Sequence, residues 1–217
     1  MIVILILLYL QGINCSLNSI TLTNKNHVSI IGEINKNTVS KFIKDIQVIT
    51  KPKIYIYINS EGGDVLLGHK IVQYMNYKKY QNRTLHCITD KALSMAFHIF
   101  QHCDERFVLH NTILMQHQMQ LQFEISDTLE NINNYVKMYN KINDKMIQIE
   151  SNRIGMTQEQ YKIKTMAEWW IHGKDAIKYR VADKLINAIG CNTELLNSTR
   201  IIIDSGVLRK ESSCPLI

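Results

Sequence analysis

The stretch from Lys53 to His69 constrains the fold most strongly, because it changes from a strand pattern to a helix pattern within a few residues. It reads KIYIYINSEGGDVLLGH. Isoleucine and tyrosine alternate from Ile54 to Ile58, which predicts a β-strand, and helical spacing follows from Val65 to Tyr77. The glycine pair Gly62-Gly63 stands between them. It leaves the backbone free to turn N–H groups toward a ligand or a developing oxyanion, although an ordinary turn at a strand end also needs glycine.

The rest of the chain continues this alternation of strand and helix patterns. Further strands are predicted at Val28–Ile34, Thr84–Thr89, Arg106–His110, Thr112–His117 and Val181–Ile186. Further helices are predicted at Thr38–Ile49, after Ser94 through His102, at Asp127–Ile154 and after a capping box at Thr157–Gln160. Asn37 or Thr38 is the expected cap of the first of these helices, and Gly155 ends the longest one. The order predicts an α/β fold.

Composition indicates one globular domain. The 217 residues are 46% hydrophobic and include only nine glycines and two prolines. The net charge of +6 is spread along the chain, and the densest cluster, Lys78-Lys79 with Arg83, is interpreted as a solvated face. Five cysteines without a CxxC pair indicate neither a disulfide framework nor a zinc ribbon. We expect a domain at residues 18–189 and a C-terminal tail at 190–217.

Residues 1–17 form a separate apolar segment. Met1 to Leu10 reads MIVILILLYL and precedes QGINCS, which is typical of a secretory signal, although no basic residue stands before the apolar run. A buried N-terminal strand or a contact between subunits is the alternative, and membrane anchoring ranks third because the run is short for a bilayer. The compartment therefore stays open.

Three motifs together resemble a known family. NSEGG, KALSMAF and LMQHQ occur in this order and are similar to the signatures NSPGG, QAASMGAF and VMIHQP of the proteolytic subunit of Clp protease, over Val28 to Ile186. The resemblance implies a serine peptidase without metal or cofactor, on the ββα spiral fold shared with crotonases. It also implies a long handle helix, two stacked heptameric rings around a chamber, and a cytoplasmic or organellar location. An AAA+ unfoldase would supply unfolded proteins, since the chain has no GxxxxGK[ST] motif.

The same resemblance assigns catalytic roles to individual residues. Ser94 falls on the nucleophile and His117 on the general base, while Gly63 and Met95 fall on the two oxyanion donors. The family segment RDxFMSAxEAxxYGLID is similar to residues 167–183, which places Glu168 where the family has aspartate.

These residue types suit the chemistry of a triad. A serine hydroxyl needs a histidine to accept its proton, and a carboxylate selects the imidazole tautomer and stabilises the imidazolium. Glutamate performs that task in some hydrolases, but its extra methylene must be accommodated. If Glu168 does not serve, Asp175 is the next carboxylate in the sequence.

Two further groups of residues have competing interpretations. Tyr55 and Tyr57 match aromatic positions at which the family docks its ATPase partner, but tyrosines on a strand are also ordinary core residues. His98, His102 and Cys103 have spacing that suits a metal ligand set, but no further ligand is suitably spaced, so the interpretation as helix-face residues is favoured.

Departures from the family pattern leave two functions open. Leu93 and Ala96 stand where the family has smaller residues around the serine, and the prolines of the signatures NSPGG and VMIHQP are absent here. Met119–Glu124 replaces a glycine-rich strand of the family. Intact Ser94 and His117 favour an active endopeptidase, whereas the departures favour a structural ring subunit. A membrane serine protease with a serine-lysine dyad and an acyl-CoA enzyme of crotonase type are less consistent with the motifs, because neither explains the Ser94 and His117 pairing.

Overall fold

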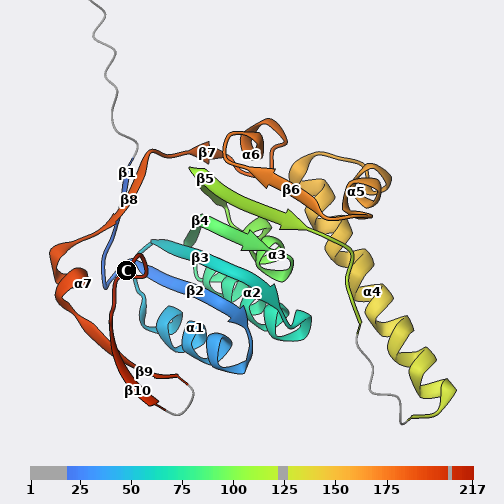
Figure 1. Cartoon of the computed structure of the whole chain (residues 1–217), viewed down its shortest axis with the longest axis horizontal. Helices are drawn as coiled ribbons and strands as arrows, with labels where there is room; N and C mark the ends of the chain where they lie inside the picture. The colour runs from blue at the N-terminus through green and yellow to red at the C-terminus, as the bar shows by residue number, and fades with distance from the viewer. Residues whose placement is uncertain (1–18, 122–126, 205–206) are drawn as a thin grey trace, which may run out of the picture.

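The computed structural model describes residues 19–121, 127–204 and 207–217, with the backbone alone at 200–204, 207–209 and 211 (Figure 1). The predictions for residues 1–17 and for part of Met119–Glu124 lie outside these ranges. The strands are β1 (Ser19–Leu22), β2 (His27–Ile34), β3 (Lys53–Gly63), β4 (Thr84–Leu93), β5 (Glu105–Gln116), β6 (Trp169–His172), β7 (Lys184–Leu185), β8 (Ala188–Cys191), β9 (Thr199–Asp204) and β10 (Val207–Ser212). The helices are α1 (Lys36–Val48), α2 (Val65–Tyr80), α3 (Met95–Gln101), α4 (Leu129–Ile154), α5 (Gln158–Thr165), α6 (Asp175–Lys178) and α7 (Thr193–Asn197).

The central sheet confirms the predicted α/β architecture. Its strand order is β2-β3-β4-β5-β6, with β7 beside β5. Strands β2 to β5 are parallel, and β6 runs antiparallel to β5. Helices α1, α2 and α3 connect successive parallel strands, and such crossovers have one preferred hand, so the three helices cover the same face of the sheet (Figure 1).

The alternation in β3 separates two hydrophobic clusters. Ile54, Ile56 and Ile58 are fully buried in the main core with side chains from α1, α2 and α3. Tyr57 points to the opposite face, because successive strand residues point to opposite sides. It belongs to a second cluster with Leu22, Ile88, Phe107, Ile186, Leu195 and Cys214.

Strand β5 is one strand where the sequence analysis predicts two. Its pairing with β4 steps from Val108 opposite Thr89 to Ile113 opposite Lys91, so the strand bulges between these points. Thr112 closes the bulge, since its hydroxyl accepts from the Leu109 N–H at 2.8 Å and donates to the Thr89 carbonyl at 2.7 Å. The exposed His110-Asn111 pair in the bulge interrupts the apolar pattern, which is why the sequence looked like two strands.

The helix ends are set by side-chain caps. The cap of α1 is Asn35, whose side chain accepts from the N–H groups of Asn37 and Thr38, so the predicted cap was two or three residues too late. The capping box of Thr157 and Gln160 is confirmed, and Gly155 ends α4 with φ 80°.

Helix α4 packs on the core with its second half only. Met146, Ile147 and Ile154 are buried there. The first half projects beyond the sheet (Figure 1), and Leu129, Tyr135 and Met138 are 81%, 49% and 41% exposed. Within the ranges that the structure describes, none of the helices is long and apolar enough to cross a membrane.

The C-terminal residues form three short strands and a helix and fold back onto the domain. Strand β8 pairs in parallel with β1, and β9 and β10 form an antiparallel hairpin. A disulfide joins Cys191 to Cys214, and a second one joins Cys87 to Cys103 in the core. The sequence analysis predicted neither disulfide. Leu195 and Cys214 cover the face of the sheet on which Tyr57 lies.

A buried arginine anchors the chain after α6 to the start of β5. Arg106, 2% exposed, donates to both carboxylate oxygens of Asp183, from Nη2 at 2.7 Å and from Nε at 3.0 Å. Burial alone would raise the pKa of Asp183, but the hydrogen bonds and charge of Arg106, with the charge of Arg153, outweigh it and lower the pKa. The paired, ionised carboxylate holds the segment between α6 and β7 against the start of β5.

Candidate active site

Ser94 lies in a tight turn between β4 and α3. Its backbone has φ 53° and ψ −121°, a region that residues with a side chain rarely adopt. The turn is held from both sides, because the Ser94 N–H donates to the Met115 carbonyl at 2.8 Å and the His98 N–H donates to the Ser94 carbonyl at 3.2 Å. The strained turn presents the hydroxyl at the start of a helix, as nucleophile turns do.

His117 meets Ser94 because β4 and β5 are neighbours in the sheet. Leu93 pairs with Met115, so the residues that follow each strand end lie side by side. The His117 Nε2 atom is 2.8 Å from the Ser94 hydroxyl oxygen. With the ring proton on Nδ1, Nε2 accepts the hydroxyl proton, which is the geometry that a general base requires.

The glycine pair packs directly against this turn. Gly62 has φ 94°, and a Cβ atom there would lie 2.6 Å from the Leu93 carbonyl oxygen and 2.8 Å from Ser94 Cβ. Gly63 has φ 140°, and its Cβ would lie 2.7 Å from the Ile34 carbonyl oxygen. Neither position accepts a side chain. The family resemblance assigned a catalytic role to Gly63 alone, yet Gly62 is the glycine that lets β3 approach the serine.

The predicted oxyanion donors lie beside this contact. Met95 is the first residue of α3, so its N–H has no partner within the helix. Gly63 ends β3, the strand next to the serine turn. The roles of Gly63 and Met95 remain predictions.

Glu168 has a suitable backbone position, but its carboxylate contacts another residue. Trp169 pairs with Gln116 in the antiparallel ladder, so extending the register by one residue sets Glu168 opposite His117. Its Oε2 accepts a hydrogen bond from the Trp170 indole at 2.9 Å, and the side chain is exposed. Among the residues with described positions, none bonds to His117 Nδ1. Glu168 as the third triad member remains a prediction.

Asp175, the alternative carboxylate, lies outside the ladder between β5 and β6. It begins α6, after His172, which pairs with Ile113 rather than with the end of β5. Its place in the register therefore gives it no advantage over Glu168.

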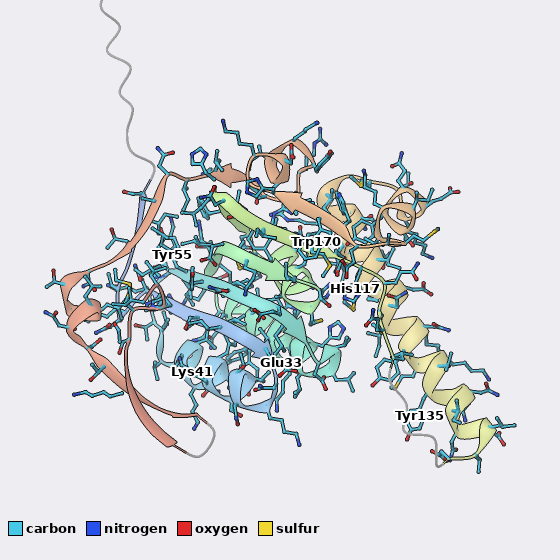
Figure 2. All side chains as sticks on the ribbon, in the orientation of Figure 1. Glu33, Lys41, Tyr55, His117, Tyr135 and Trp170 are labelled. Atoms are coloured by element: carbon cyan, nitrogen blue, oxygen red, sulfur yellow. A yellow bond between two sulfur atoms is a disulfide. The ribbon has the colours of Figure 1, made fainter. Side chains whose placement is uncertain are left out.

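A cleft of about 1100 Å³ opens above the serine and the histidine. Ser94, His117, Gly63 and Met95 line one side, and residues of α4 and α5 line the other, including Met146 and Tyr161. Figure 2 shows His117 at the end of β5, facing α4. A cleft of this volume can admit several residues of an extended polypeptide.

The two tyrosines predicted as docking residues lie away from this cleft. Figure 2 shows Tyr55 near the opposite end of the sheet from His117. Tyr57 is 2% exposed, and its hydroxyl donates to Asp90 Oδ2 at 2.8 Å. Burial, followed by the charge of Asp90, raises the pKa of Tyr57. Of these two tyrosines Tyr55 alone is partly accessible, and docking remains a prediction.

The residues His98, His102 and Cys103 join other interactions. Cys103 is in the disulfide with Cys87, and the His98 Nδ1 atom is 2.5 Å from a carboxylate oxygen of Glu150. Burial, followed by the charges of His98 and Lys79, lowers the pKa of His102 to about 3, so this imidazole is neutral. Among residues 19–121, 127–204 and 207–217, no three His, Cys, Asp or Glu side chains form a group that could hold a metal ion.

Glu150 was missed by the sequence analysis. It occupies a polar position in the pattern of α4, where a solvated face is the ordinary interpretation, yet it is 1% exposed. Nothing in the local sequence distinguishes it from the exposed glutamates of the chain.

Comparison with known proteins gives a consistent family. The family model described as Clp protease matches residues 14–188. An ATP-dependent Clp protease proteolytic subunit of Borreliella afzelii is 27% identical over 164 residues, which cover 73% of this chain and 82% of that protein. The ATP-dependent Clp protease proteolytic subunit 2 of Treponema denticola is 23% identical over 167 residues, covering 75% of this chain and 82% of that protein.

The match spans β2 to β6 and includes the strand ends that carry Ser94 and His117. The mixed sheet, the helices that cover one of its faces and the long helix α4 agree with the spiral fold of Clp proteases and crotonases. The chain therefore belongs to the Clp protease family, as a divergent member.

Proposed function

We propose that this protein is a serine endopeptidase that cleaves unfolded polypeptides inside an oligomeric chamber. The observation that carries the proposal is the 2.8 Å contact between the Ser94 hydroxyl and His117 Nε2, made by two residues on adjacent strand ends beside a polypeptide-sized cleft. Family membership supports the reaction class, because the relatives are named as proteolytic subunits.

The reaction follows the general course of serine peptidases. His117 Nε2 accepts the Ser94 proton while the serine oxygen attacks the peptide carbonyl carbon. The carbonyl oxygen becomes an oxyanion, which the N–H groups of Gly63 and Met95 stabilise. The imidazolium then gives its proton to the leaving amine. In the second half, His117 accepts a proton from water as the water oxygen attacks the acyl carbon, and the proton passes to the Ser94 oxygen when the acyl group leaves as a carboxylic acid.

The carboxylate step requires a side-chain movement. Glu168 must exchange its bond with the Trp170 indole for a bond with His117 Nδ1. This exchange needs only a change of rotamer, because the backbone of Glu168 already stands opposite His117 in the register. In the alternative function, a structural ring subunit, the carboxylate stays on Trp170 and the serine does not turn over.

Assembly is the second part of the proposal. The exposed apolar residues of the first half of α4, Leu129, Tyr135 and Met138, call for a covering surface, and another subunit supplies it in a heptameric ring, alone or stacked. The relatives are named ATP-dependent, and this chain has no nucleotide-binding loop of its own, so an AAA+ unfoldase supplies the substrate. Tyr55 is the residue that we propose for contact with it.

The nucleophile is tested by substitution and by a fluorophosphonate probe. Ser94→Ala and His117→Ala should each lower peptide hydrolysis on the order of 10³-fold or more, and the double variant should be no worse, because triad members act as a unit. Labelling should occur at Ser94 in the wild type and should be absent in Ser94→Ala. Ser40→Ala, at an exposed position on α1, is the control and should label normally. An assembled wild-type protein that does not label would support the structural subunit instead.

The third member is tested by Glu168→Gln with Trp170→Phe beside it. Glu168→Gln should keep the fold and lower turnover by roughly 10² to 10⁴-fold, since an amide cannot stabilise the imidazolium. Trp170→Phe frees the carboxylate from the indole and should leave the rate unchanged or raise it. Asp175→Asn should be close to wild type. Nearly full activity in Glu168→Gln would show that this carboxylate takes no part.

Assembly is tested by native mass measurement at micromolar concentration. We expect heptamers or paired heptamers, and Tyr135→Glu should shift the population toward smaller species by placing a charge on the apolar half of α4. Lys137→Glu reverses the charge at an exposed neighbouring position and is the control. A wild-type protein that remains monomeric would rule out the chamber.

A further inference from the structure

A buried carboxylate connects the elements that carry the serine and the histidine. Glu150, on the buried half of α4, contacts three side chains from three different elements. Its Oε1 is 2.5 Å from His98 Nδ1, and both of its oxygens accept from Gln116 Nε2 at 3.0 Å. The Tyr161 hydroxyl of α5 donates to its Oε2. Of these four residues, only Gln116 lies within one of the three sequence motifs.

The Gln116 side chain links Glu150 to the general base, because it bonds to both residues. Its amide nitrogen donates to the Glu150 carboxylate, and its amide oxygen accepts from the His117 N–H at 3.1 Å. Only this orientation suits both partners, because a carboxylate can only accept and a backbone N–H can only donate. Since β5 ends at Gln116, this bond holds His117 at the point where the ladder stops.

His98 connects Glu150 to the nucleophile, with its side chain on Glu150 and its backbone N–H on Ser94. His98 lies on α3, and its N–H donates to the Ser94 carbonyl in the first turn of that helix. Its imidazole is completely buried between Glu150 and His102, whose Nε2 is 3.1 Å from His98 Nε2. One carboxylate is therefore bonded to the residue four positions after the serine and to the residue just before the histidine.

The carboxylate is suited to this position by its acceptor capacity. Glu150 is 1% exposed, and burying a carboxylate is costly unless donors compensate for the lost water. Three donors meet it here, and an aliphatic side chain in its place would leave them unpaired. Burial, followed by the charge of Glu150, raises the pKa of Tyr161, so the tyrosine stays a protonated donor.

We infer that Glu150 is a positioning residue, which sets the distance between Ser94 and His117 by fixing His98 on one side and Gln116 on the other. This inference rests on the proposed role of the pair as nucleophile and base. It assigns Glu150 no contact with substrate. Its effect is on the alignment of the serine and the imidazole, to which rates are sensitive, since a misplacement of about 1 Å costs roughly 100-fold.

Two variants that each remove a buried hydrogen bond near Glu150 separate positioning from stability. Gln116→Leu cuts the connection from Glu150 to His117. Ser151→Ala removes the bond from the buried Ser151 hydroxyl to the Gln148 carbonyl, one residue along α4, and leaves every bond of Glu150 in place. For Gln116→Leu we expect fluorophosphonate labelling of Ser94 and kcat to fall by about 10 to 100-fold, with KM within about twofold. For Ser151→Ala we expect both rates within about threefold of wild type. Melting temperatures of the two variants measure the stability that each loses with its hydrogen bond.

Crystal structures of the same variants supply a measurement that does not depend on activity. The distance from Ser94 Oγ to His117 Nε2 should lengthen beyond hydrogen-bonding range in Gln116→Leu and should stay near its present 2.8 Å in Ser151→Ala. Equal rates in the two variants, or an unchanged distance in Gln116→Leu, would overturn the positioning role. A wild type that neither labels nor cleaves would refute the proposed function, and the distances would still decide whether Glu150 sets the geometry.

Discussion

The approach of Gly62 to the serine turn is the contact on which the rest of the site depends. A Cβ atom at that glycine would overlap the Leu93 carbonyl and the Ser94 side chain, so β3 and β4 can come this close only with hydrogen at the position. The close approach brings the end of β3 beside the nucleophile, and the neighbouring β5 supplies the histidine. Strand register, rather than loop conformation, therefore determines which side chains meet.

Much of this arrangement was predictable because its signals are local. The alternation in β3 and the glycine pair are readable over a few positions. The motifs KALSMAF and LMQHQ are equally short, and the structure has Ser94 directly after β4 and His117 directly after β5. The bulge of β5 was not predictable, because it depends on Thr112 bonding to the neighbouring strand. Glu150 escaped prediction for the same reason, since its partners lie on three other elements.

The C-terminal residues show a further limit of sequence reasoning. No local sequence pattern predicts what covers the strand face that carries Tyr57. Leu195 and Cys214, which are distant in the sequence, cover this face. The Cys191–Cys214 disulfide joins the two ends of their segment. Cysteine counting gave no pairing, because pairing follows from the fold and not from spacing. Tyr55 packs against the same cluster, so the C-terminal residues lie beside the tyrosine proposed for docking.

The central claim is that Ser94 and His117 form one functional pair in the cleft. A peptidyl chloromethyl ketone tests it directly, because such reagents alkylate an active-site histidine while the serine oxygen adds to the ketone carbon. Peptide mapping by mass spectrometry should find the reagent on His117, and a crystal structure of the adduct should show it bonded to Ser94 Oγ as well. Modification elsewhere, or none in the assembled protein, would contradict the account.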